Sequence, residues 1–122
     1  MKKLNALGMT LVVAASALFS QVAAAHASLK KSVPAADATV DVAPKEITLT
    51  FSEHVEEAFS TVTVKDAAGK DVSTAKSHVD AADGATLHLD VPSLQSGVYT
   101  VQWAAVTHDS HRRTGDFKFT VK

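Results

Sequence analysis

The sequence predicts an all-β domain built as a two-sheet sandwich of about seven short strands. Polar and apolar side chains alternate over several short segments, and turn-forming residues separate these segments. No part of the chain after residue 25 carries an apolar stripe of helical period. The chain has 122 residues, of which 97 remain when the first 25 are set aside, and this length suits one compact domain.

The first 25 residues have the pattern of a secretory signal peptide. Lys2 and Lys3 form a basic start, and residues 4–19 are mostly apolar. Residues 23–25 are three alanines, the small residues that signal peptidase requires before its cut. The apolar run is shorter than the roughly 20 residues of a membrane-spanning helix. We therefore expect residues 1–25 to be removed and residues 26–122 to form an exported domain without a membrane span.

Composition excludes several classes of function. The chain has 12 basic and 13 acidic residues, and loss of Lys2 and Lys3 leaves 10 against 13, a formal charge of -3. A domain with this balance lacks the basic face that nucleic-acid binding requires. The chain has no cysteine, and both methionines, Met1 and Met9, lie in the leader. The exported domain therefore offers no sulfur ligand to a soft metal.

The strands are predicted from alternation with a period of two residues. A turn is expected at residues 33–37, and residues 66–70 have turn chemistry ahead of a short strand at 71–72. The remaining predicted strands are residues 46–51, 60–64, 86–91, 98–106 and 116–122.

One strand begins with a pattern typical of immunoglobulin-like sandwiches. Gly97 precedes Tyr99 at the start of the longest strand, and Trp103 follows on the same face. In such sandwiches a tyrosine at this place bonds through its hydroxyl to upstream backbone, forming a tyrosine corner. Tyr99 and Trp103 are equally well explained as ordinary core aromatic residues.

Cleavage after residue 25 would make His26 the first residue of the exported protein. A free N-terminal histidine offers its α-amine and its imidazole Nδ1 to one metal ion. The amine has an ordinary pKa of about 7.7–8.0, so a metal can displace its proton near neutral pH. A nitrogen-rich tetragonal set favours Cu(II). Alternatively, His26 simply follows the cleavage site and binds nothing.

A second group of candidate ligands lies at residues 107–111, after the longest strand. If this segment is extended, Asp109 and His111 lie on one side and His108 lies on the other. An imidazole and a carboxylate on one side are suitable ligands for a divalent ion. A polar surface loop without a metal is the alternative. His54 is expected to be a solvated loop residue or a weak additional ligand, and His78 and His88 to lie on the surface or a sheet face.

These motifs together resemble the CopC-type periplasmic copper-binding proteins. The resemblance covers the whole exported chain and rests on residues 26–29, 32–37, 47–53, 59–64, 97–103, 109–111 and 115–119. It implies a cupredoxin-like, immunoglobulin-like Greek-key β-sandwich. It also implies one Cu(II) ion per chain, held by the amine and Nδ1 of His26, by Asp109 and by His111.

Three departures from the family pattern are visible. The residue between the aspartate and histidine of the motif is usually glycine, whereas it is Ser110 here. His108 is an additional imidazole, and it leaves open which histidine completes the site. The methionine-rich Cu(I) site of some family members cannot form, because residues 26–122 contain no methionine.

The resemblance implies a periplasmic copper carrier or buffer in copper resistance, with an inner-membrane CopD-type protein as a possible recipient. We do not expect an enzyme. One alternative is a copper-dependent oxidative enzyme with a histidine brace, because such enzymes also use an N-terminal histidine. Another is a β-sandwich adhesion or interaction module that binds no metal.

Overall fold

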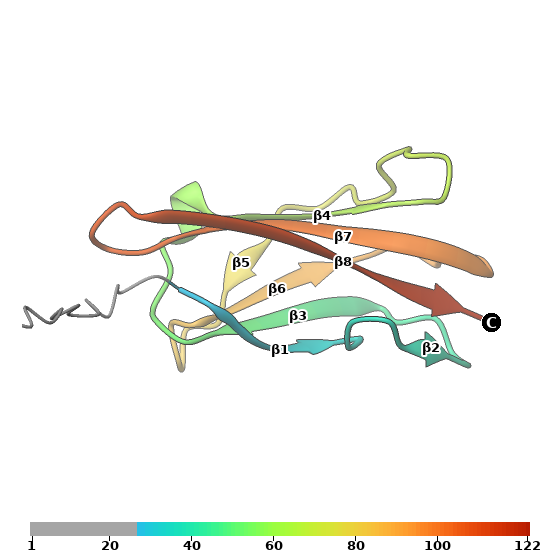
Figure 1. Ribbon diagram of the computed structural model, residues 1–122, viewed down its shortest axis with the longest axis horizontal. Coiled ribbons are helices and arrows are strands. Elements are labelled where there is room, and N and C mark those ends of the chain that lie inside the picture. The colour runs from blue at the N-terminus through green and yellow to red at the C-terminus, as the bar shows by residue number, and fades with distance from the viewer. Residues whose placement is uncertain (1–26) are drawn as a thin grey trace, which may run out of the picture.

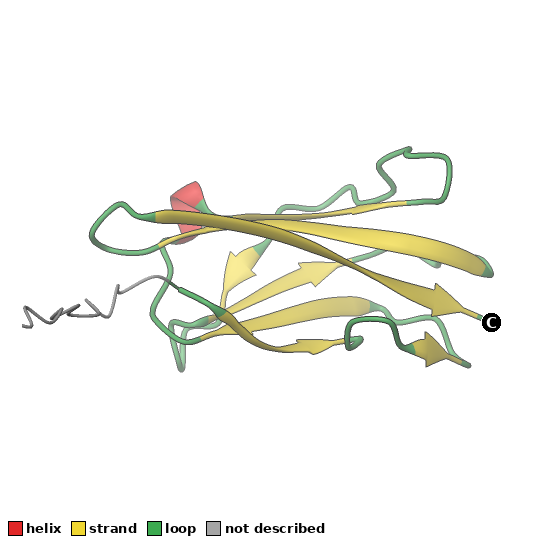
Figure 2. Ribbon diagram, viewed as in Figure 1, coloured by secondary structure: helices red, strands yellow, loops and turns green. Residues whose placement is uncertain are grey.

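The computed structural model describes residues 27–122, and within them the protein is a sandwich of two four-stranded sheets. Figure 1 shows the two sheets as stacked layers, and Figure 2 shows that a single short helical turn accompanies the strands in the part described. That turn is a 3-10 helix, η1. The elements in chain order are β1 (Leu29–Val33), β2 (Thr39–Val40), β3 (Glu46–Phe51), η1 (Glu57–Phe59), β4 (Thr61–Lys65), β5 (His78–Val79), β6 (Thr86–Asp90), β7 (Gly97–Val106) and β8 (Arg112–Val121).

The chain crosses repeatedly between the two sheets. One sheet has the strand order β1-β3-β6-β5 and the other has the order β2-β8-β7-β4. All pairs are antiparallel except β2 with β8, which is parallel. The expected all-β sandwich is thus confirmed, with eight described strands in place of about seven.

The strands that the sequence did not predict are β1, β2 and β5. β1 has the sequence LKKSV, without apolar alternation, and it lies at a sheet edge against β3. Lysine on an edge strand is a common protection against edge-to-edge association. β2 and β5 have two residues each, too few to show a period. At residues 71–72, where a strand was expected, Asp71 forms only an isolated bridge to Lys65.

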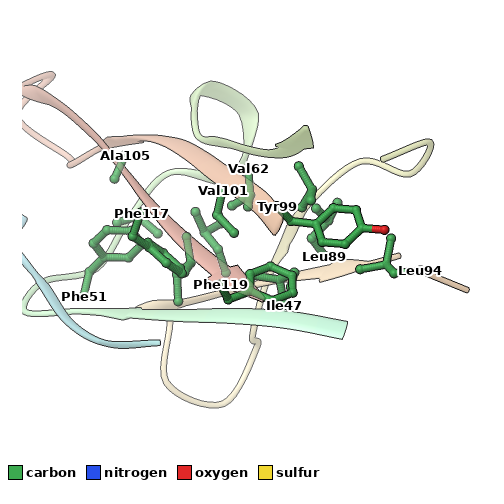
Figure 3. Packing of buried hydrophobic residues seen from close by; sticks show 14 of the residues in the cluster. Ile47, Phe51, Val62, Leu89, Leu94, Tyr99, Val101, Ala105, Phe117 and Phe119 are labelled. Carbon is green, nitrogen blue, oxygen red and sulfur yellow. The ribbon is translucent and has the colours of Figure 1, made fainter. Parts of the chain in front are cut away.

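The alternation predicted for the longer strands matches the core. Along β3, Ile47, Leu49 and Phe51 are buried, while the residues between them are exposed or half-buried. Side chains from both sheets meet between the layers, as Figure 3 shows. They include Val62 and Val64 of β4, Leu87 and Leu89 of β6, Tyr99 and Val101 of β7, and Phe117 and Phe119 of β8.

The predicted tyrosine corner is present at the start of β7. The hydroxyl of Tyr99 donates a hydrogen bond to the carbonyl oxygen of Gln95, 2.7 Å away, and the ring stacks on Phe119. At the opposite end of β7, the Trp103 ring meets Phe51 of the other sheet edge-on, with ring centroids 5.0 Å apart. These aromatic contacts tie β7 to its neighbours at both ends.

The β7–β8 hairpin is longer than the sequence predicted. Its ladder runs from the pair Gly97 and Val121 to the pair Val106 and Arg112. We expected the last strand to begin at residue 116, because Arg112 and Arg113 are polar and show no alternation. Both arginines are exposed, so burial leaves no pattern at this end, and the pairing with β7 defines the strand. The hairpin carries residues 107–111 at its tip.

Candidate metal centre

Residues 107–111 form a closed turn at the end of the β7–β8 hairpin. The backbone N–H of Thr107 donates to the carbonyl oxygen of His111 over 3.1 Å, and that of Ser110 donates to Thr107 over 2.9 Å. Ser110 has a φ of 70°, in the left-handed region that favours glycine. The glycine that the family pattern has at this position is therefore explained by the backbone conformation.

The turn corrects the extended geometry that we expected for this segment. In an extended strand His108 and His111 would lie on opposite faces because the side chains alternate. The left-handed residue Ser110 and the two backbone hydrogen bonds reverse the chain instead. The directions of His108, Asp109 and His111 follow from this turn and from the partners of each side chain.

Asp109 and His111 are brought together. The Nδ1 atom of His111 lies 3.2 Å from Oδ2 of Asp109, and both side chains are about half exposed. The hydroxyl of Thr107, a buried residue, donates a hydrogen bond to Oδ1 of Asp109 and lowers the pKa of that carboxyl below its usual range. The backbone and charge of His111 lower this pKa further. Asp109 is therefore a carboxylate at neutral pH, next to an imidazole nitrogen.

The described chain begins at the same end of the sandwich. Ala27 is buried, and the backbone N–H of Ser28 donates to Oγ of Ser52 over 2.9 Å. Ser52 in turn lines a surface hollow together with Thr107 and Asp109. Figure 1 shows the start of β1 and the tip of the β7–β8 hairpin at one end of the molecule. His26, the first predicted ligand, and the predicted signal peptide at residues 1–25 lie outside the described residues.

His108 contacts neither Asp109 nor His111 through its side chain in any interaction that we observe among residues 27–122. Its Nδ1 atom lies 2.5 Å from Oε1 of Glu56, a residue whose backbone N–H donates to Val106. The ring of His54 lies opposite, with its centroid 6.3 Å from that of His108. From the sequence we expected His54 to be a solvated loop residue or a weak additional ligand, and no local pattern indicates that it would approach His108.

His78 and His88 occupy paired positions of β5 and β6, as the sheet-face interpretation predicted. Their rings stack with centroids 5.4 Å apart. The two nitrogens of His88 face carboxylates, Nε2 facing Asp80 at 3.0 Å and Nδ1 facing Glu46 at 3.2 Å. The hydrogen bond with Asp80, followed by that with Glu46, raises the pKa of His88 above its ordinary value of 6.5. Because both nitrogens are engaged, His88 has a structural role.

The donors at the hairpin tip fit a copper ion in part. Imidazole nitrogen and carboxylate oxygen are suitable ligands for Cu(II), and Asp109 and His111 provide one of each side by side. Within residues 27–122, however, no three histidine or acidic side chains converge on one point.

Comparison with known proteins gives consistent results. The model of the CopC domain matches residues 29–122. The chain is 38% identical over 99 residues to Protein YobA of Escherichia coli K12, covering 80% of each chain. It is 36% identical over 122 residues to Copper resistance protein C of Escherichia coli, covering 94% of this chain and 91% of that one. The crystal structure of CopC from Methylosinus trichosporium OB3b superposes with a TM-score of 0.76 at 33% identity, covering 80% of this chain and 94% of that one.

Proposed function

The chain belongs to the CopC family, and from this premise we propose that it is an exported Cu(II)-binding protein that holds one copper ion through His26, Asp109 and His111. Its relatives named Copper resistance protein C support a copper-related role in resistance. In this proposal copper is the cargo that the protein takes up and releases.

The observation that carries the proposal is the pairing of Asp109 with His111 beside the start of the described chain. Ala27, the residue after His26, is buried at this end, and its neighbour Ser28 is bonded to Ser52 in both directions. The chain is thus anchored one residue after His26, at the end that carries the hairpin tip. The amine and Nδ1 of His26 would add two nitrogens to the nitrogen of His111 and the oxygen of Asp109, a set that suits tetragonal Cu(II).

The location and the partner follow from the same proposal. The pattern of residues 1–25 supports export, and we propose that the protein acts in the periplasm as a carrier or buffer. In residues 27–122, no helix has the length and apolar character needed to cross a membrane. An inner-membrane CopD-type protein is the recipient that the family resemblance suggests.

The test is an electron paramagnetic resonance spectrum of the chain beginning at His26, with one equivalent of Cu(II). We expect a tetragonal, nitrogen-rich signal, and we expect the His111→Ala variant to lose one nitrogen ligand and to bind copper more weakly. His78→Ala is the matched control, because His78 is an exposed histidine of β5 whose ring stacks on His88 and not on a proposed ligand. A spectrum that His111→Ala leaves unchanged contradicts the proposed ligand set.

The placement of the aromatic residues supports the enzyme alternative less than it supports the copper-binding role. A copper enzyme that oxidises polysaccharides uses exposed aromatic rings to hold its substrate. Here Tyr99 is buried and the Trp103 ring packs between Phe51 and β8. Among the described residues, Phe59 alone presents a largely exposed aromatic ring. Consumption of ascorbate and peroxide that depends on a polysaccharide would favour the enzyme, and absence of stoichiometric copper binding would favour the metal-free module.

A further inference from the structure

Two imidazoles, those of His54 and His108, lie beside the Asp109–His111 pair, on a hollow that Asp109 also lines. The hollow is lined by Ser52, Glu53, His54, Thr107, His108 and Asp109. His54 precedes β4 and His108 lies in the hairpin turn, so the fold joins them from segments more than fifty residues apart. Both side chains are exposed.

The ring of His108 is oriented as metal-binding histidines are. Its Nδ1 atom is bonded to Oε1 of Glu56. A histidine that binds a metal through one nitrogen usually bonds its other nitrogen to a carboxylate, which holds the ring in one tautomer and raises its basicity. With Nδ1 held by Glu56, Nε2 is the nitrogen of His108 that can bind an ion.

The ring of His54 packs against Gly84. A Cβ at Gly84 would lie 3.3 Å from Nδ1 of His54 and 3.4 Å from its Cγ, so the ring rests on the glycine backbone. The carbonyl oxygen of Gly84 accepts a hydrogen bond from Val55, the next residue after His54. Gly84 therefore lies closest to Nδ1, Cγ and Cδ2 of the ring, which would be 3.3, 3.4 and 3.5 Å from the added Cβ, and Nε2 is not among these nearest atoms.

The separation of the two rings fits one shared ion. Two imidazoles on opposite sides of a metal have centroids roughly 6.5 Å apart, given a metal–nitrogen bond of about 2.0 Å. The observed distance is 6.3 Å, and the rings are tilted by 60°. The His78–His88 pair differs, because its rings stack face to face at 23° and carboxylates occupy both nitrogens of His88.

We propose that His54 and His108 form a second Cu(II) position, weaker than the first and completed by water. This inference rests on the proposed function, since it concerns a second position for the same cargo. Only two protein nitrogens hold the ion, and no third histidine or acidic residue of the described chain converges on them. The side chain of His108 is 69% exposed, so water and a partner protein have access to the ion.

The test is a Cu(II) titration of the protein that begins at His26, followed by calorimetry and electron paramagnetic resonance with one and then two equivalents. We expect a second, weaker binding event with a signal from two nitrogens. His54→Asn and His108→Asn should each weaken this second event by about tenfold or more, and Glu56→Gln by about tenfold. His78→Asn, which changes an imidazole outside the hollow, should leave it unchanged.

The two copper positions are tested separately. His111→Ala should alter the first event and leave the second in place, so failure of the proposed function is distinguishable from failure of this inference. A second event that persists in the His54→Asn and His108→Asn variants, or that is lost equally in His78→Asn, overturns the second position. The same holds if His108→Asn changes the spectrum with one equivalent, because His108 would then belong to the first site.

Discussion

The indole ring of Trp103 on β7 lies directly against the backbone of Gly115, its partner across the ladder on β8. A Cβ added to Gly115 would lie 2.6 Å from Cζ2 of Trp103, closer than any real contact. The other side of the indole meets Phe51 of the opposite sheet. Gly115 thus makes room for the ring that joins the two sheets beneath the hairpin tip.

We predict that Gly115→Ala destabilises the protein by about 1–3 kcal/mol, the usual cost of overpacking. The free energy of unfolding in urea measures this loss. Thr114→Ala, at the neighbouring exposed position, should stay within about 0.5 kcal/mol of the original protein. Trp103→Leu in the Gly115→Ala background should recover part of the loss, because the residues are in contact. Independent, additive effects of the two changes would contradict the packing relationship.

Ser110→Gly is predicted to stabilise the protein by about 0.5–1 kcal/mol. Ser110 has a φ of 70°, a conformation that costs a residue with a Cβ roughly 1–2 kcal/mol. Glycine avoids this cost, but it also increases the conformational entropy of the unfolded chain, which offsets part of the stabilisation. Thermal and urea unfolding measure the difference. Ser93→Gly, an exposed position outside the positive-φ region, should instead destabilise the protein by about 0.4–1 kcal/mol. If both variants lose stability equally, the left-handed conformation at Ser110 is wrong.

The raised pKa of His88 predicts that the stability of the protein depends on pH. Its pKa is raised in the folded protein by Asp80 and then by Glu46, so its contribution is fully present below the unfolded value of about 6.5. The contribution is lost as the pH rises from 6.5 through the higher folded pKa. At acid pH, the hydrogen bond with His88 lowers the pKa of Asp80 below 3.8 in the folded protein. The stability that ionised Asp80 contributes is therefore lost as the pH falls below 3.8 and through this lowered pKa.

Urea unfolding between about pH 5.5 and 8.5 tests this dependence. We expect the original protein to lose stability across the upper part of the range, and His88→Asn to remove that slope. His78→Asn is the control, because His78 stacks on His88 without an ion pair to Asp80 or Glu46 in the described structure. An unchanged slope in His88→Asn would show that other groups cause the dependence.

One extra residue before His26 is predicted to weaken Cu(II) binding severely. The extension turns the α-amine into a peptide nitrogen without an available lone pair and breaks the chelate with Nδ1. Loss of a direct ligand should cost more than the roughly 10- to 100-fold of a supporting residue. Competition with a chelator measures the affinity, and a one-residue extension after Lys122 is the control. Equal affinity of the N-terminally extended protein would refute the chelate.

The longer strands were predictable because their pattern is local. The buried residues Ile47 and Leu49 recur every second position whatever the rest of the chain does, and this period alone indicates a strand with one buried face. Gly97 and Tyr99 are also close in sequence, and together they predicted the tyrosine corner. Asp109 and His111 were recognised as candidate ligands from their residue types, but a turn brings them into contact and not the extended backbone that we expected.

Sequence alone determined the class of fold, the buried faces of the longer strands, and the residue types available to a metal. Tertiary structure decided the edge strand β1, the turn at Ser110, and the meeting of His108 with Glu56 and His54. The pair His108 and Glu56 are 52 positions apart, and no periodicity extends over such a distance. Their contact depends on which strands pair and in what register, since the pairing of β7 with β8 sets the hairpin tip beside the segment before β4.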